Sequence, residues 1–260
     1  FSGGLDSTVL LHSLNRQIQN HHLKNRLIAI HINHGLQQDS DAWTHLCADF
    51  CNELGVEFES ISVDVGQVQR QGVESVARKK RYQAFFNVLQ STADGVLVTA
   101  HHQRDQAETV FLNLMRGAGV NGLAAMQFKS ELSPAKWLEG DSDSSGRSYH
   151  HFRPFLNVPY SELVNYSQEH NLSFIDDPSN LDTNLRRNFV RHKIFPELRE
   201  LWSSLDKGVS STATHMQEAL GLLDEYAQAV LDSTCHSSDF IEVPHASVCL
   251  LYTSDAADDE

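Results

Sequence analysis

The chain has 260 residues, of which 40% are hydrophobic and 21% charged, and a formal net charge of −14. That length predicts one large domain or two modest ones, and the composition excludes a largely disordered protein. The sequence lacks a run of about 18 apolar residues, so we expect no membrane span. It shows no export signal, and its four cysteines are too few for a disulfide framework, so we expect a cytoplasmic protein.

The negative charge is concentrated near the C-terminus. Residues 1–200 carry 23 acidic and 19 basic side chains, whereas residues 201–260 carry 11 acidic side chains and one basic one. The first part also contains two basic clusters, at 78–81 and 186–193. A polyanionic partner is therefore compatible with this sequence in spite of its net charge.

Short apolar segments alternate with amphipathic ones along the first half of the chain. Segments rich in Val and Ile predict strands at 27–32, 57–63 and 95–100, the first and third buried on both faces. Apolar residues at helical spacing predict helices at 5–19, 40–54, 73–90 and 105–116. This alternation favours right-handed crossovers and hence an α/β fold with a doubly wound, Rossmann-like parallel sheet, followed by a small helical region.

Changes in composition set the predicted domain boundaries. Residues 1–130 form a predicted nucleotide-binding domain, 131–150 an exposed loop, and 151–200 the end of the catalytic domain, with a basic helix near 183–200. Residues 201–248 form a helical region with a helix at 209–232. Because Phe1 is followed at once by a glycine motif, we expect a fragment that begins at the end of a strand. Residues 249–260 show no periodicity and are predicted to be an artefactual tail.

A glycine loop, SGGLDS at residues 2–7, precedes the first predicted helix. Glycines let a backbone approach a ligand closely, and a helix N-terminus favours an anion. The hydroxyls of Ser2 and Ser7 suit phosphate oxygens, whereas the Asp6 carboxylate suits a divalent cation that bridges to phosphate. The loop therefore predicts a phosphate site, with a plain tight turn as the alternative.

A second polar segment, His101 to Thr109, directly follows the third predicted strand, where open α/β sheets place their ligand sites. A helix that begins near residue 101 would put His101, Asp105 and Glu108 on one face. Such a set could hold a metal ion or a cationic substrate, or it could be an ordinary solvated helix start.

The glycine loop resembles the SGGxDS loop of the PP-loop ATP pyrophosphatases, which adenylate a substrate while cleaving ATP to AMP and pyrophosphate. Within that group the chain resembles the tRNA(Ile)-lysidine synthetase family. The matching segments are HINHGL at 31–36, ESVAR with RY at 74–82, RGAGVNGL at 116–123, and DDPSN with RNFVR at 176–191. The resemblance spans residues 2 to about 200 and fades afterwards, where the family's C-terminal tRNA-binding region is missing or cut short.

The resemblance implies a ligase that uses ATP, Mg²⁺, L-lysine and tRNA(Ile) with a CAU anticodon. ATP would adenylate the wobble cytidine at C2 and release pyrophosphate, and the lysine ε-amine would then displace AMP to form lysidine. A homodimer is compatible with the resemblance. Two alternatives remain: another PP-loop adenylating enzyme, of the amidotransferase or tRNA thiolation type, and an inactive fragment that binds nucleotide or tRNA.

The same resemblance implies roles for individual residues. ATP phosphates would be held by Ser2, Gly3, Gly4, Leu5, Asp6 and Ser7, with Asp6 also on Mg²⁺. The catalytic residues would be Asp6, Arg81, His101 and Asp105; the lysine site would be Asp105, Glu108 and Arg187; and the tRNA contacts would be Arg78, Arg116 and Arg191. The family usually has two adjacent acids where this chain has Arg104 and Asp105. We align the essential acid with Asp105; if Arg104 replaces it instead, lysine binding is in doubt.

Overall fold

The computed structural model describes residues 1–35, 39–63, 73–92, 94–133, 137 and 147–233. The chain packs into two compact units. The first comprises Phe1–His101, Phe128–Pro154 and Tyr160–Asp177, and the second comprises His102–Gln127, Phe155–Pro159 and Pro178–Glu260. Both units are discontinuous in sequence, so they do not coincide with the linear domains expected at 1–130 and 151–200. The predicted tail at 249–260 lies outside the described residues.

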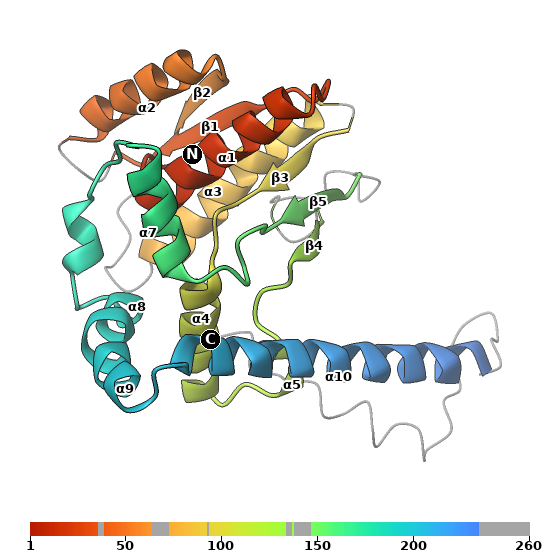
Figure 1. Ribbon diagram of the computed structural model, residues 1–260. Coiled ribbons are helices and arrows are strands. Elements are labelled where there is room, and N and C mark those ends of the chain that lie inside the picture. The colour runs from red at the N-terminus through yellow and green to blue at the C-terminus, as the bar shows by residue number, and fades with distance from the viewer. Residues whose placement is uncertain (36–38, 64–72, 93, 134–136, 138–146, 234–260) are drawn as a thin grey trace. The chain divides into compact units, whose positions relative to one another are not determined.

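The first unit combines strands with helices, labelled in Figure 1. Its elements are α1 (Leu5–Asn20), β1 (Ile28–Asn33), α2 (Ser40–Leu54), β2 (Glu57–Ser62), α3 (Val73–Gln90), β3 (Val96–Val98), β4 (Lys129–Leu132), β5 (Tyr149–Phe152) and α7 (Tyr160–Glu169). β1 pairs with β2 in parallel, and β5 pairs in parallel with β3 but antiparallel with β4. The α/β class is confirmed, with β4 as an antiparallel addition.

Two expectations about the β3–β5–β4 sheet were wrong. The third predicted strand is not buried on both faces, because Val96 in β3 is 51% exposed. The predicted exposed loop at 131–150 begins in β4 and ends in β5, where Leu132 and Tyr149 are buried. Strands of three or four residues are too short for periodicity to identify, since their ladder partners decide whether they form.

Two clusters of apolar side chains form the core of the first unit. Helix α3 buries Tyr82, Phe85 and Phe86 in this core. They pack with residues of α3 and all three strands of the second sheet, namely Leu89, Leu97, Leu132 and Tyr149. A second cluster joins α1, β1 and α2 through Leu11, Ala29 and Cys51 together with Val56. Burial of this apolar surface is the main term that stabilises the unit.

The second unit is helical in its described part. Its elements are α4 (Gln103–Met115), α5 (Val120–Leu123), η1 (Pro178–Leu181), α8 (Arg186–Phe189), η2 (Val190–Ile194), α9 (Phe195–Leu201) and α10 (Leu205–Ser233). Ala107, Val190 and Phe195 form its buried cluster, and α10 packs against α4 and α5. The helix predicted at 209–232 is confirmed within α10. Among the described helices, none combines the length and the apolar character that crossing a membrane requires.

The basic helix expected near 183–200 is divided into two short α-helices, α8 and α9, with a π-helical turn between them. η2 is a π-helical turn between α8 and α9, and Pro196 stands in the first turn of α9. Because Pro196 has no amide hydrogen to donate to the preceding turn, the regular helical ladder is interrupted there. Arg187 and Arg191, four residues apart, project from this segment.

Candidate functional site

The glycine loop enters α1 through a left-handed turn at Gly3, whose φ is +79°. The Gly3 carbonyl accepts hydrogen bonds from the Ile175 amide at 2.8 Å and from the Thr8 hydroxyl at 3.2 Å. The Oγ atoms of Ser2 and Ser7 lie 3.1 Å apart across the loop. Hydrogen bonds from Thr8, in α1, and from Ile175, distant in sequence, therefore hold the loop at Gly3. The loop also brings the hydroxyls of Ser2 and Ser7 together.

The N-terminus of α1 offers a site that suits an anion. Gly4 is the N-cap and provides no side-chain hydrogen bond to the first-turn amides of this 16-residue helix. Such amides and the helix dipole attract phosphate. Asp6 lies in the same turn, where a carboxylate beside phosphate requires a cation between them, and Mg²⁺ prefers such oxygen ligands. The donor set of loop 2–7 therefore fits the phosphates of ATP together with Mg²⁺.

Two predicted arginines project from α3 in the same unit. Arg81 Nη2 lies 3.4 Å from Nε2 of His34, which directly follows β1. Burial, together with the nearby Arg81 charge, lowers the pKa of His34 to about 4, so this ring is neutral at physiological pH. The guanidinium of Arg78 lies 5.1 Å from the ring centroid of Tyr82. Both arginine side chains are exposed.

Asp105 is positioned by the start of α4. The backbone amide of His102, the N-cap, donates to Asp105 Oδ2 at 3.1 Å, and the Arg104 amide donates to Nδ1 of His102 at 3.2 Å. This reciprocal pair is a capping box, and it starts the helix at Gln103. The helix thus begins two residues before the predicted 105 and two after 101, the start that would have put His101 on one helical face with Asp105 and Glu108.

Asp105 and Glu108 form ion pairs with two arginines. Arg187 donates through Nε to Glu108 Oε2 at 2.9 Å and through Nη2 to Asp105 Oδ1 at 3.0 Å. Arg191 donates to the two oxygens of Glu108 at 2.6 and 2.8 Å, and to Asp105 Oδ1 at 3.0 Å. Glu108 is completely buried. We call these four residues the carboxylate–arginine cluster.

The cluster brings together three residues that the sequence assigned to one site, namely Asp105, Glu108 and Arg187. It also includes Arg191, which the resemblance implied as a tRNA contact. Each carboxylate oxygen of the cluster accepts a hydrogen bond from an arginine or from the amide of His102. An ammonium group can therefore reach either acid only when one of these contacts opens. The remaining predicted tRNA contact, Arg116, caps the C-terminus of α4 and is exposed.

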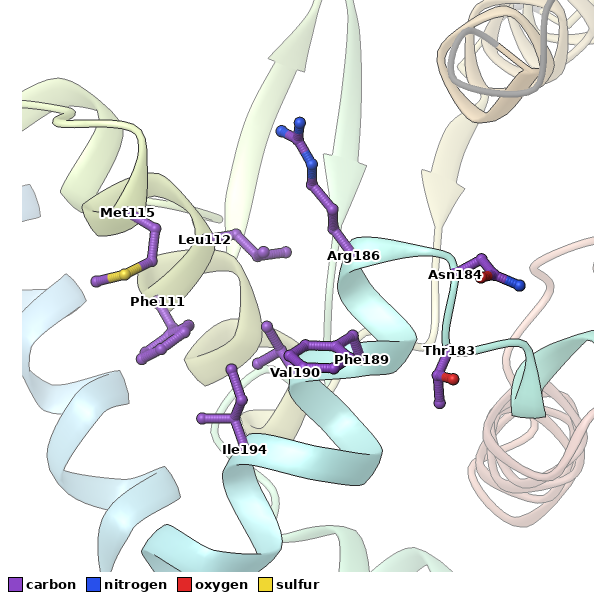
Figure 2. Close-up of a pocket in the computed structure, with 9 residues that line it drawn as sticks. All are labelled: Phe111, Leu112, Met115, Thr183, Asn184, Arg186, Phe189, Val190 and Ile194. Atoms are coloured by element: carbon purple, nitrogen blue, oxygen red, sulfur yellow. The ribbon is translucent and has the colours of Figure 1, made fainter.

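The second unit also contains an apolar hollow (Figure 2). Its volume is about 290 Å³, and its lining includes Phe111 and Leu112 from α4 and Phe189, Val190 and Ile194 from the α8–η2 segment. The polar residues at this hollow are Thr183, Asn184 and Arg186. Because η2 carries both the hollow and Arg191, packing here helps to hold the arginine in place.

His101 belongs to a partly buried hydrogen-bonded network in the first unit. Its Nδ1 lies 2.8 Å from Thr99 Oγ1, which in turn lies 2.8 Å from Nε2 of His151. Arg153 Nη2 lies 3.0 Å from Nδ1 of the same His151 ring. Sequence analysis missed Thr99, His151 and Arg153. The sequence YHHF at 149–152 has no alternation of apolar and polar residues, so only the structure shows that His151 is buried.

The buried His151 ring should make stability depend on pH. Burial, followed by the charge of Arg153, lowers the pKa of His151 to about 3, with His101 and Arg78 acting in the same direction. The unfolded ring, with a pKa of about 6.5, takes up a proton that the folded ring refuses, so stability is lost as pH falls below 6.5. We expect His151 to account for a loss of about 2 kcal/mol between pH 7.5 and 5.

Urea denaturation at both pH values measures this effect. The quantity to compare is the change in the free energy of unfolding between pH 7.5 and 5. This change should be smaller in the His151→Asn variant than in the unmodified protein, whatever the stability of the variant at pH 7.5. Equal losses in the two proteins would contradict the buried neutral ring.

Comparison with known proteins identifies the family. A family model for the PP-loop domain matches residues 1–198. The chain is 39% identical over 241 residues to a tRNA(Ile)-lysidine synthase from Hydrogenovibrio crunogenus, covering 93% of this chain and 54% of that protein. It is 41% identical over 242 residues to a tRNA(Ile)-lysidine synthase from Pseudomonas fluorescens, covering 92% and 50% respectively. The chain thus spans about half the length of the curated relatives that it matches.

A solved structure shares the fold. The U34-tRNA thiolase NcsA from Methanococcus maripaludis, determined with its [4Fe-4S] cluster, aligns with a TM-score of 0.61 over 84% of this chain and 71% of that one. At 18% sequence identity the likeness concerns the fold alone. The family match covers the glycine loop, the uncapped start of α1 and all the described strands, so this chain belongs to the PP-loop family.

Proposed function

We propose that this chain is the catalytic part of a tRNA(Ile)-lysidine synthetase. The C2 oxygen of the wobble cytidine in tRNA(Ile) with a CAU anticodon attacks the α-phosphorus of ATP, and pyrophosphate leaves. The ε-amine of L-lysine then bonds to C2 and AMP leaves with that oxygen. The observation that carries this proposal is the identity of about 40% to synthases of that name over nine-tenths of the chain, together with the phosphate-binding geometry of loop 2–7.

Loop 2–7 binds the phosphates in this proposal. The first-turn amides of α1 and the hydroxyls of Ser2 and Ser7 hold the phosphate oxygens, and Asp6 holds Mg²⁺. Mg²⁺ held by Asp6 would supply positive charge that neutralises the phosphates and the leaving pyrophosphate. Arg81, on α3, adds a cation for the same purpose. His101 is the fourth proposed catalytic residue, and one of its ring nitrogens takes part in hydrogen bonding or proton transfer at the reacting groups.

Lysine binding requires an exchange of partners within the carboxylate–arginine cluster. The substrate ammonium takes a place at Asp105 and Glu108, and the substrate carboxylate accepts a bidentate contact from the released Arg187. Free lysine carries two ammonium groups and one carboxylate at neutral pH, so one ammonium and the carboxylate can each replace a contact that the exchange opens. The family usually has two adjacent acids at positions 104 and 105. In this proposal Asp105 is the essential one of the two, and Arg104 replaces the other.

Arg78 and Arg116 are the proposed tRNA contacts, because both are exposed basic groups free to meet phosphate. Arg191 is committed to Glu108 and Asp105 and contributes to the lysine site instead. The cytoplasmic location and the homodimer that the resemblance allows stay predictions. The free thiols of Cys47 and Cys51 agree with a reducing compartment, and burial raises the pKa of each to about 11, which makes them poor nucleophiles.

The function is tested by measuring pyrophosphate release and lysidine formation with the full-length protein. Release that depends on both lysine and cognate tRNA supports the synthetase. Release without lysine dependence points to another adenylating enzyme, and ATP binding without release points to an inactive binding protein. Asp6→Asn should lower kcat/KM for ATP by about 10-fold or more, because it removes the charge that holds Mg²⁺. The matched control is Asp41→Asn, which removes the first-turn acid of α2 and should leave activity unchanged.

The proposed partner exchange predicts a selective defect in Arg187→Ala. Loss of the guanidinium should raise the KM for lysine by about 10-fold, while the KM for ATP stays the same, because one charge-assisted contact is lost. Arg186→Ala is the control, because this neighbouring arginine is exposed and lines the apolar hollow. Within the described residues, the ion pairs of Asp105 and Glu108 with arginine involve Arg187 and Arg191 and do not include Arg186. Equal lysine KM values in the two variants would contradict the role of Arg187.

A further inference from the structure

A chain of hydrogen bonds links Arg153 to His101 through two intermediate side chains. The distances are 3.0 Å from Arg153 Nη2 to His151 Nδ1, 2.8 Å from His151 Nε2 to Thr99 Oγ1, and 2.8 Å from Thr99 Oγ1 to His101 Nδ1. All four residues belong to the first unit, and β5 carries His151 while Thr99 and His101 follow β3. Arg153 can only donate a hydrogen bond, so the donor and the acceptor of each following bond can be deduced from it.

Arg153 determines the tautomer of His151. A guanidinium group carries only N–H donors, so Nδ1 of His151 must accept. This ring is 1% exposed, and burial beside the Arg153 charge lowers its pKa to about 3, so it is neutral at physiological pH. A neutral imidazole that accepts at one nitrogen carries its proton on the other. The Nε2–H of His151 therefore donates to Thr99 Oγ1.

Thr99 passes this direction to His101. A threonine hydroxyl has one hydrogen to donate. With its oxygen already accepting from His151, that hydrogen is directed to the other close ring nitrogen, Nδ1 of His101. We propose that this relay holds His101 with its proton on Nε2, so that His101 acts as a hydrogen-bond donor and not as the base that deprotonates lysine. Thr99, His151 and Arg153 are positioning residues in this proposal.

The ligand of the His101 Nε2–H group should be an oxygen that gains negative charge. This step rests on the proposed function, in which charge develops on phosphoryl oxygens of the nucleotide during adenylation. A neutral imidazole donor, held by a partly buried network, is oriented before the reaction and stabilises such an oxygen. The proton that leaves the lysine ammonium passes to the carboxylate of Asp105, which holds that ammonium in the proposed lysine site. The relay therefore assigns a specific role to the catalytic residue His101, namely the donation of a hydrogen bond to a phosphoryl oxygen of the nucleotide.

The tautomer can be measured directly by NMR on protein labelled with ¹⁵N-histidine. Long-range ¹H–¹⁵N correlation distinguishes a protonated ring nitrogen from an unprotonated one. The chain has 15 histidines, so the signals of His101 and His151 are assigned by their loss in His101→Gln and His151→Gln. At pH 7.5 we expect both rings to carry the proton on Nε2. A proton on Nδ1 of His101 would overturn the proposal, because Thr99 would then accept from both rings.

Two substitutions at Thr99 test the relay itself. Thr99→Val keeps the side-chain shape but removes the hydroxyl, so His101 should populate both tautomers, whereas Thr99→Ser should keep the Nε2–H form. Thr99→Val should also lower the kcat for lysidine formation by about 10-fold with little change in the KM for lysine. A His101 spectrum in Thr99→Val identical to that of the unmodified protein would refute the relay.

The ring spectra require no activity, so the two proposals can fail separately. A protein that forms lysidine but carries the His101 proton on Nδ1 refutes only the relay. A protein that shows the expected tautomers but forms no lysidine, with cognate tRNA and lysine present, refutes the proposed function.

Discussion

Glu108→Gln should lower the free energy of unfolding by about 3–5 kcal/mol, because it breaks a buried ion cluster on one side only. Glu108 is completely buried and accepts hydrogen bonds from both Arg187 and Arg191. Glutamine has almost the same shape, but it removes the negative charge and turns an N–H₂ group toward guanidinium donors. Urea denaturation monitored by circular dichroism measures the loss.

The matched control is Glu57→Gln, which breaks an exposed pair with similar distances. Arg26 donates to Glu57 at 2.6 and 2.8 Å, yet both side chains are at least half exposed. Exposed pairs contribute little, so this variant should unfold at the same urea concentration as the unmodified protein. Adding Arg191→Met to Glu108→Gln should recover part of the lost stability, because it removes a cation that has lost both of its contacts with Glu108 and keeps only the one with Asp105. A Glu108→Gln protein as stable as the Glu57→Gln control would contradict the buried cluster.

Gly3→Ala should destabilise the protein by about 2–4 kcal/mol and abolish ATP binding at loop 2–7. The φ of +79° at Gly3 is strained for any residue with a Cβ. That Cβ would also lie 2.6 Å from Cδ1 of Ile175 and 2.8 Å from Sγ of Cys47. The isoleucine methyl can turn away, but Cys47 is 1% exposed and has little room to move. The loop backbone must therefore shift, which displaces the phosphate-binding amides.

Gly4→Ala separates backbone strain from the simple loss of a glycine. Gly4 has a φ of −72°, and its added Cβ would meet no described atom closer than Ser2 Oγ at 3.7 Å. Its thermal unfolding should match that of the unmodified protein within about 1 kcal/mol. Isothermal titration with ATP and Mg²⁺ then reports on the loop in each variant. Equal stability of the two alanine variants would show that Gly3 does not require the left-handed turn.

Local periodicity predicted much of the first unit. The helices at 40–54 and 73–90 have the predicted bounds, because each has a broad apolar face and a clear local boundary, such as the left-handed Gly55 after α2. The strands β4 and β5 were missed, since four-residue segments carry too little periodicity and are defined by pairing with each other and with β3. The start of α4 was misplaced by two residues because the His102–Asp105 capping box outweighed the apolar pattern.

The sequence by itself determined the α/β class and the family resemblance, and it predicted a phosphate site at loop 2–7, because these depend on residue types at short, fixed spacing. Only the tertiary structure decided the partners of the site residues. Arg187 and Arg191 reach Glu108 across about 80 residues, and His151 reaches Thr99 across 52. Contacts over such separations are set by how helices and strands pack, and neither residue type nor periodicity specifies them. The structure therefore placed Arg191 with the acids and linked His101 to His151 through Thr99.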